Sequence, residues 1–137
     1  MYERILVAID DSEVAEQVLV AAQELAILSS GEVWVVHVHE GDPSKHASPT
    51  AHPSGDAHAM VDEAVAKLAS AGVTAHAEVS FNLSGYAARE IIYAAQAHEV
   101  GVIVMGSRGL SDIAGLVLGS TAHKVIHLTH RPVLIVR

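Results

Sequence analysis

The sequence predicts an α/β fold: an open, twisted, mainly parallel five-stranded sheet with four helices on its two faces. Three observations support this prediction. Short apolar runs alternate along the chain with longer segments of helical spacing. Half of the 137 residues are hydrophobic but only 4% are aromatic, so the core must come from Val, Ile, Leu and Ala, as in buried parallel sheets. The length suits one domain spanning residues 1–137.

Five segments have the apolar character of strands. The expected strands are Arg4 to Ile9, Glu32 to His39, Val73 to Ser80, Val100 to Met105 and Pro132 to Val136. The third of them alternates apolar and polar residues, which is typical of a strand with one solvated face. We therefore expect it near an edge of the sheet.

Four segments have helical spacing. The first follows Ser12 and ends at Ser30-Gly31, and the others run from Asp56 to Ala71, Ser84 to His98 and Ala122 to Thr129. Ser12 is expected to cap the first helix with its hydroxyl, and Gly31 to close it in the left-handed conformation. Gly72 is expected to stop the second helix.

The stretch from Glu40 to Gly55 separates the second strand from the second helix. It contains three prolines, two glycines and two histidines. Such a segment is too polar and too rich in Pro to fold alone, so we expect a mobile flap.

Charge and composition exclude several classes of function. A net charge of −8 argues against nucleic acids and anionic membranes as partners. The absence of Cys excludes disulfides and thiolate metal sites. Polar residues interrupt the apolar stretch from Val14 to Leu28, and Met1 to Arg4 leads directly into a strand, so neither a membrane span nor a signal peptide is expected. These features favour a cytoplasmic protein.

A glycine-rich segment after the fourth predicted strand favours a phosphate site. Gly106 and Gly109 follow the strand, and Gly119-Ser120 precedes the last helix. Glycines there remove side chains that would keep an anion away, and they permit positive φ. The first N–H groups of the helix, from Ser120 to Ala122, would face the anion with the helix dipole behind them.

These residues resemble a known family. The segment fits G-x-x-G, nine residues, then G-[ST], as Gly106-x-x-Gly109, Leu110 to Leu118 and Gly119-Ser120. The run from Ile5 to Ser12, His37-Val38 and the run from Arg131 to Val136 agree with the same pattern. The chain thus resembles the nucleotide-binding branch of the universal stress protein family. The resemblance implies a Rossmann-like sheet of the adenine nucleotide alpha hydrolase-like type.

The resemblance also implies an ATP site, with Mg²⁺ or Mn²⁺ bound through the phosphates. Asp10 would contact the ribose hydroxyls, and Arg108 would pair with phosphate oxygens. The full implied set is Ala8, Ile9, Asp10, Val38, Met105, Gly106, Ser107, Arg108, Gly109, Gly119, Ser120 and Thr121. A homodimer is implied as well, through the strand from Val133 to Val136, whose apolar edge would otherwise be a liability.

One region departs from the family pattern. Where a Gly-x-Pro turn is common, this chain has the run from Asn82 to Tyr86. We expect a loop of different shape there.

The sequence favours an ATP-binding sensor or regulatory module in a stress response, with slow or absent hydrolysis. No catalytic residue is assigned, because the P-loop motif G-x-x-x-x-G-K-[ST] is absent and Asp10 is committed to the ribose. The alternative is a dimerisation or protein-interaction module with a vestigial pocket. A phosphorelay receiver is excluded, because the fourth strand is followed by Gly106-Ser107 rather than a lysine.

The ten histidines suggest metal binding as a further alternative. His46, His52 and His58 recur every six residues, and His123 and His127 are one helical turn apart. Solvated side chains are the favoured interpretation of both sets, and no protein metal ligand is assigned. His37 is interpreted as a hydrogen-bonded core residue.

Overall fold

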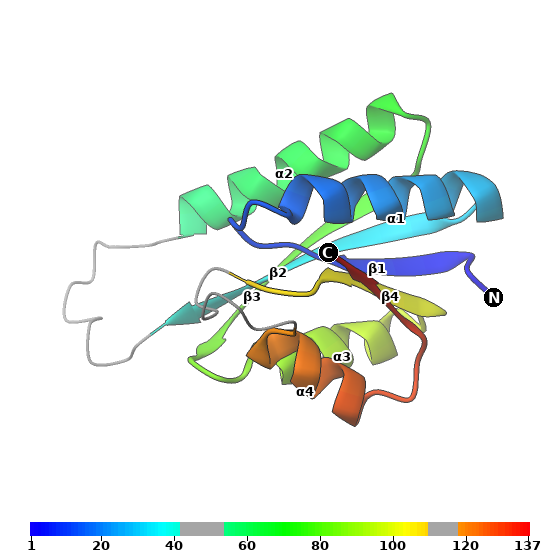
Figure 1. Cartoon of the computed structure of the whole chain (residues 1–137). Coiled ribbons are helices and arrows are strands. Elements are labelled where there is room, and N and C mark those ends of the chain that lie inside the picture. Colours follow the sequence, from blue (N-terminus) through cyan, green and yellow to red (C-terminus); the bar gives the residue numbers. More distant parts are fainter. Residues whose placement is uncertain (42–53, 110–117) are drawn as a thin grey trace.

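The computed structural model describes residues 1–41, 54–109 and 118–137 of the chain. A central sheet lies between two pairs of helices, α1 with α2 on one face and α3 with α4 on the other (Figure 1). The elements in chain order are β1 (Arg4–Ala8), α1 (Ala15–Ser29), β2 (Glu32–Gly41), α2 (Ser54–Ser70), β3 (Ala75–Leu83), α3 (Ala87–Ala97), β4 (Val102–Gly106), α4 (Ser120–Leu128) and β5 (Val133–Val136).

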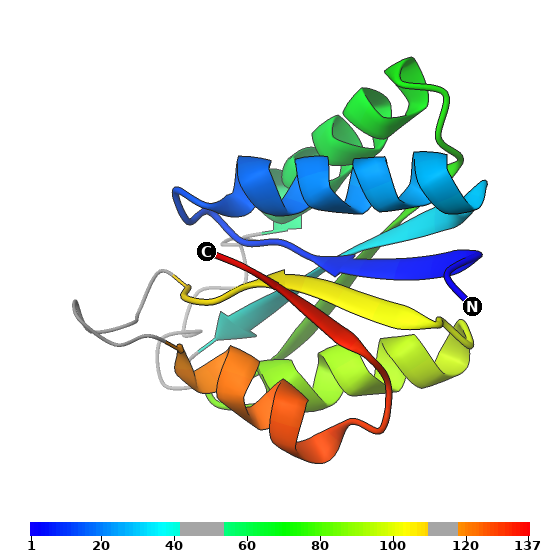
Figure 2. The same cartoon turned by 45° about the vertical axis from the view of Figure 1, so that its right-hand side comes forward.

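All strand pairs of the sheet are parallel, in the order β3-β2-β1-β4-β5. The central strand β1 pairs with β2 on one side and with β4 on the other, so that Val7 is in register with both Val35 and Val104. Figure 2 shows β5 rotated relative to β1, as the twist of a sheet requires. The predicted fold class is confirmed, and so is the placement of the third strand at an edge.

Two apolar cores hold the layers together. Side chains of β1 alternate between them, because successive residues of a strand point to opposite faces. Ile5 and Val7 pack under α1 and α2 with Leu68, whereas Leu6 packs against α3 and α4 with Ile103. These five side chains are completely buried.

The boundaries of several elements differ from the expected ones because of local hydrogen bonds. Helix α3 begins at Ala87 rather than Ser84, since the preceding residues form a turn in which the Tyr86 amide donates to the Leu83 carbonyl at 3.2 Å. Strand β2 continues to Gly41, because every residue of β3 pairs with it, up to Leu83 opposite Gly41. Gly72 ends the second helix segment with a φ of +81°, as expected.

The predicted cap of the first helix is wrong. Helix α1 begins at Ala15, and no side chain caps its N-terminus. Ser12 instead donates its backbone N–H to Oδ1 of Asp10 at 2.9 Å. The carboxylate of Asp10 therefore organises the turn that the Ser12 hydroxyl was expected to organise, because an Asp side chain readily accepts from the amide two residues on.

The predicted role of Gly31 is wrong as well. The left-handed residue is Ser30, with a φ of 54°. Gly31 is required by close packing instead, since a β-carbon there would lie 2.6 Å from the carbonyl oxygen of Tyr2. This contact sets the distance between the end of α1 and the start of β1.

A similar correction applies to Gly106 at the end of β4. Its φ is not positive, contrary to what the glycine-rich segment suggested. A β-carbon on Gly106 would lie 2.9 Å from Cγ2 of Val14, in the turn before α1. The missing side chain thus allows this turn to approach the end of β4.

Most of the flap expected from Glu40 to Gly55 lies outside the described residues. Of that stretch, Glu40 and Gly41 belong to β2, and Ser54 and Gly55 belong to α2. Among the helices of the described residues, none is long and apolar enough to cross a membrane.

The two explanations of the end of α1 predict opposite results for neighbouring substitutions. We expect Gly31→Ala to lower the free energy of unfolding by about 1 kcal/mol or more, because the added methyl meets backbone atoms. Ser30→Gly should be neutral or raise it by up to about 1 kcal/mol, because glycine tolerates positive φ. Urea unfolding followed by the fluorescence of Trp34 measures both. A neutral Gly31→Ala would contradict the close-packing explanation.

The contact between Gly106 and Val14 predicts coupling between two sites. Gly106→Ala should cost about 1 kcal/mol in the wild-type background and measurably less in the Val14→Ala background, where the clashing methyl is gone. A double-mutant cycle by urea unfolding measures the difference. Equal costs in both backgrounds would show that Val14 is not the constraint.

Candidate functional site

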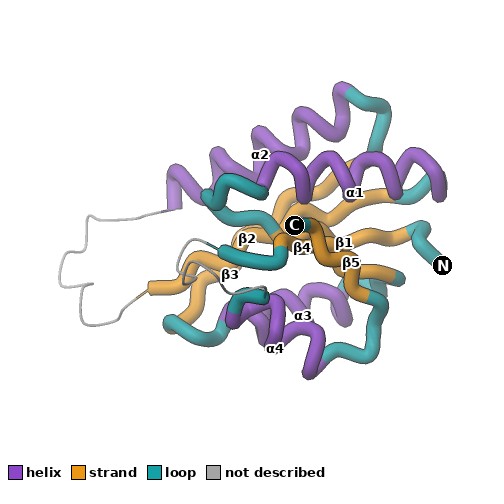
Figure 3. The backbone as a smooth tube through the Cα atoms, viewed as in Figure 1, coloured by secondary structure: helices purple, strands orange, loops and turns teal. Residues whose placement is uncertain are grey.

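The carboxyl ends of the parallel strands bring three chain segments to one edge of the sheet. Asp10 follows β1, Glu40 is near the end of β2, and Gly106 ends β4. Figure 3 shows the loops after β1 and β4 side by side at this edge. The strand order reverses between β1 and β4, which is where open α/β sheets bind ligands.

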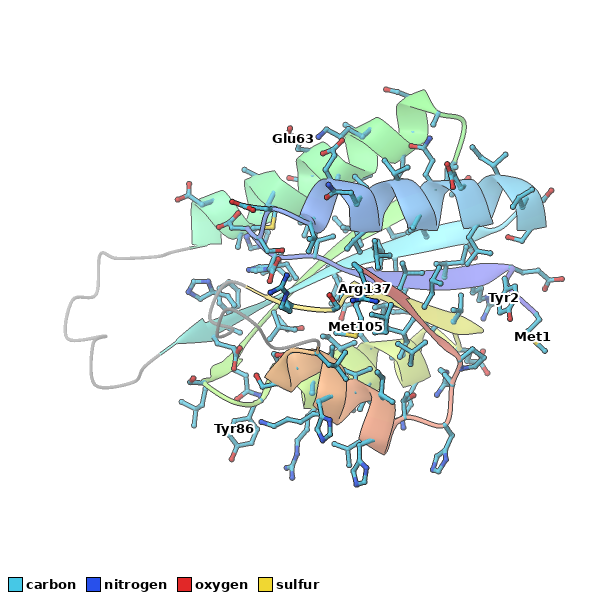
Figure 4. All side chains as sticks on the ribbon, viewed as in Figure 1. Met1, Tyr2, Glu63, Tyr86, Met105 and Arg137 are labelled. Carbon is cyan, nitrogen blue, oxygen red and sulfur yellow. The ribbon has the colours of Figure 1, made fainter. Side chains whose placement is uncertain are left out.

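A pocket with a cavity volume of about 110 Å³ opens at this place. It is bounded by the ends of β1, β2 and β4, the turn before α1, and the first turns of α3 and α4. Met105, at the pocket floor, lies in the sheet layer between the two pairs of helices (Figure 4).

Ten of the twelve residues singled out from the sequence line this pocket. They are Ala8, Ile9, Asp10, Val38, Met105, Gly106, Ser107, Arg108, Gly109 and Thr121. Gly119 and Ser120 do not line it; they stand directly before Thr121, at the start of α4. Four separate segments of the chain thus converge on one hollow.

Asp10 is held in place by hydrogen bonds of the turn after β1. Its Oδ1 accepts from the Ser12 amide at 2.9 Å, and the preceding Ile9 donates its N–H to the Val36 carbonyl at 3.0 Å. The Ile9 carbonyl accepts from Nδ1 of His37 at 2.9 Å, so the hydrogen bond expected for His37 is confirmed. These contacts fix the carboxylate of Asp10 between the ends of β2 and β4.

Ser107 joins the β4 loop to the start of α4. Its N–H donates to the Val136 carbonyl at 2.8 Å, and its carbonyl accepts from the Gly119 N–H. Only 6% of Ser107 is exposed. The loop after β4, the N-terminus of α4 and the last strand are therefore held as one unit.

The two halves of the pocket differ in hydrogen-bonding character. Arg108 is the one residue with a permanent positive charge among the described residues that line the pocket. The first turn of α4, beside it, contains no acidic residue that would neutralise the positive end of the helix. On the side of β1 and β2, Asp10 and Glu40 supply carboxylate oxygens. One half thus suits an anion, and the other suits hydroxyl or amino groups.

The loop that departs from the family pattern borders the acidic half. Gly85, with a φ of +91°, donates its N–H to the carboxylate of Glu40, and its carbonyl accepts from Nζ of Lys124 at 3.4 Å. Asn82 donates to Oε1 of Glu90 at 2.8 Å. This loop is therefore tied to β2, α3 and α4 by its own hydrogen bonds.

Several residues that line the pocket were missed by sequence reasoning. The additional lining residues are Ser12, Val14, Ala15, Val18, Val36, His37, Glu40, Ala87 and Ile91. Ala122, whose N–H the sequence predicts at the phosphate site, lines the pocket as well. Most of the missed residues are apolar residues of helix starts and strand ends, for which the sequence holds no signal besides position. Glu40 was assigned to the flap, and only the longer β2 places it in the site.

A second hollow, with a cavity volume of about 110 Å³, lies between α1 and α2. Lys67 borders it and holds Glu16 at 2.9 Å and Glu63 at 3.6 Å. The hydrogen bond to Glu16 raises the pKa of Lys67 above its ordinary value of 10.5, so the ammonium stays charged until the pH passes that raised value. The cation of this hollow is already committed to two carboxylates.

Within the part of the chain that the structure describes, no three His, Cys, Asp or Glu side chains gather as metal ligands. His123 and His127 stack on α4 with ring centroids 6.3 Å apart. His58 lies on α2, while His46 and His52 fall outside the described residues.

Comparison with known proteins agrees with this architecture. The model of the universal stress protein family matches residues 1–137. Universal stress protein YxiE of Bacillus subtilis is 33% identical over 151 aligned residues that cover all of both chains. The solved structure of MJ0577 of Methanocaldococcus jannaschii is similar, with a TM-score of 0.83, 25% identity and coverage of 99% of this chain and 96% of that chain.

The chain is also similar to a solved structure that contains a bound nucleotide. The universal stress protein of Archaeoglobus fulgidus in complex with dAMP has a TM-score of 0.73 at 25% identity, with 99% of this chain and 98% of that chain covered. The match over the whole length, the shared fold and the level of identity agree with one another. The chain belongs to the universal stress protein family.

Proposed function

We propose that this protein binds ATP in the pocket at the ends of β1, β2 and β4. The observation that carries the proposal is the convergence of four segments on one pocket, where Asp10 follows the strand between the one that supplies Val38 and the one that precedes Arg108. The base would lie beside Val38, the ribose at Asp10, and the phosphates at Arg108, Gly109 and the start of α4.

The chemistry of the pocket supports this arrangement. Ala8, Val38 and Met105 offer apolar walls for a planar base. Ionised Asp10 accepts hydrogen bonds, as ribose hydroxyls require. Arg108 and the N-terminus of α4 supply the local positive potential that a chain of net charge −8 otherwise lacks. The relative with bound dAMP supports an adenine nucleotide as the ligand.

The proposal concerns holding the nucleotide rather than hydrolysing it efficiently. Efficient hydrolysis needs a positioned water and stabilisation of charge on the transferred phosphoryl group. The sequence contains no P-loop lysine, and Asp10 is occupied by the Ser12 amide and by its proposed ribose contact. Mg²⁺ or Mn²⁺ would be held through the phosphates. We infer a small sensor or regulatory module of the cytoplasm that responds to stress.

We also propose that the protein forms a homodimer through β5. This strand is the last in the sheet order, so one of its edges has no partner strand within the described residues. Leu134 on β5 is 41% exposed. Pairing of two copies would cover both the open edge and this side chain.

Nucleotide binding predicts a rise in melting temperature. At one hundred times Kd, ATP with Mg²⁺ should stabilise the native state by about 2.7 kcal/mol, which for a domain of this size corresponds to roughly 10 °C.

Arg108→Ala should weaken binding about tenfold, because a charge-assisted hydrogen bond is lost. The control is Arg89→Ala, whose guanidinium stacks over Tyr86 and does not line the pocket.

An unchanged melting temperature at saturating ATP would contradict the proposal and leave the interaction module with a vestigial pocket. An equal loss of affinity in both arginine variants would show that Arg108 acts only through net charge.

The dimer predicts an effect of charge on the exposed strand. Leu134→Glu should convert the dimer to monomer, because two like charges would be buried near the two-fold axis. Leu28→Glu, on an apolar residue of α1 that is 84% exposed, should leave the oligomeric state unchanged. Light scattering after size exclusion measures the mass. A wild-type protein that is monomeric at tens of micromolar would refute the dimer.

A further inference from the structure

We propose that Glu40 contacts the nucleobase and selects bases that carry an exocyclic amino group. The inference rests on the nucleotide site proposed above and adds a residue that determines specificity there. Its basis is the position of one carboxylate that lines the pocket, anchored by a loop of the chain on the side opposite the cation.

The sheet order places Glu40 at the base end of the site. Glu40 lies near the end of β2, whereas Arg108 follows β4, and β1 lies between these two strands. Two strand spacings separate the two ends by about 10 Å. A nucleotide whose phosphates meet Arg108 and whose ribose meets Asp10 therefore extends its base toward β2.

The side chain of Glu40 points to the correct face of the sheet. Alternate residues of a strand share a face, so Glu40 lies on the same side as Val36 and Val38. Both valines belong to the core on the α3 side and line the pocket. Glu40 lines the pocket beside them, next to Ala87 at the start of α3.

The carboxylate of Glu40 is held in place. Its Oε2 accepts from the Gly85 N–H, and Gly85 is in turn held through its carbonyl by Lys124. Because Oε2 accepts from this loop, we assign Oε1 as the oxygen that meets a ligand.

An ionised carboxylate only accepts hydrogen bonds. The 6-amino group of adenine donates, and so it matches Glu40, whereas a base with hydrogen at that position leaves the charged acceptor without a partner. Glu40 is exposed in the free protein, and a base that covers it without donating a hydrogen bond loses affinity. The acceptors at this end and the donors at the other end together fix one orientation of the ligand.

Two nucleotides that differ only in the amino group test the proposal. Calorimetric titration with ATP and with purine riboside 5′-triphosphate, which has hydrogen in place of the 6-amino group, should give an affinity about tenfold higher for ATP in the wild-type protein. In Glu40→Gln the amide oxygen can keep the bond to the Gly85 N–H while its NH₂ group faces the pocket. The ratio should therefore fall to about one.

Glu90→Gln is the matched control, because it makes the same chemical change beside the same loop at a residue that does not line the pocket. It should keep the wild-type ratio. Thermal unfolding followed by Trp34 fluorescence shows whether the variants fold. If Glu40→Gln does not, Glu40→Asp, which withdraws the carboxylate by one methylene, should lower the ratio in its place.

Equal affinities of the wild-type protein for the two nucleotides would overturn the role of Glu40 and leave the ATP site intact. A ratio unchanged in a folded Glu40 variant would do the same. Failure of the wild-type protein to bind either nucleotide would overturn the proposed function and this inference together.

Discussion

The position of β1 between β2 and β4 is the constraint on which the site depends. Parallel pairing on both sides buries Ile5, Leu6 and Val7 completely and aligns the ends of three strands at one edge. Since α1 leads from β1 to β2 on one side, and α3 leads from β3 to β4 on the other side of β1, a gap forms beyond the carboxyl end of β1. Each part of the proposed ligand then faces a different strand: the base β2, the ribose β1 and the phosphates β4 with α4.

The loops add the polarity that the sheet itself lacks. Ser107 binds the β4 loop to α4 and β5 through its backbone, and Gly106 allows the turn before α1 to close against the same loop. Asp10 orders that turn through Ser12, while Glu40 orders the Gly85 loop. In this way each of the two carboxylates supports a backbone turn and presents an acceptor to the pocket. The acceptors therefore lie on the side of β1 and β2, and the donors lie around Arg108.

The fold could be predicted from the apolar runs that form strands, and most of the candidate pocket could be predicted from the residues that follow those strands. Apolar runs such as Val102 to Met105 mark buried strands, and the residues directly after them must meet at one edge of a parallel sheet. The predictions that were wrong concern residues whose roles depend on tertiary contacts. The glycine at position 31 is required by the close approach of the Tyr2 carbonyl oxygen. Glu40 lies in the site because pairing with β3 makes β2 longer than expected. Neither contact leaves a local signal in the sequence. The structure of residues 42–53 and 110–117 stays outside what is described.

Amide chemical shifts recorded during titration with AMP and then with ATP test the central claim most directly, because they locate each part of the ligand separately. Both nucleotides should shift the amides of Asp10 and Val38, and only the added phosphates of ATP should shift those of Gly109 and Thr121 further. Trp34, on β2 and outside the pocket lining, should remain unchanged. Identical shifts with both nucleotides, or shifts centred on Trp34, would contradict a nucleotide that runs from β2 across β1 to the start of α4.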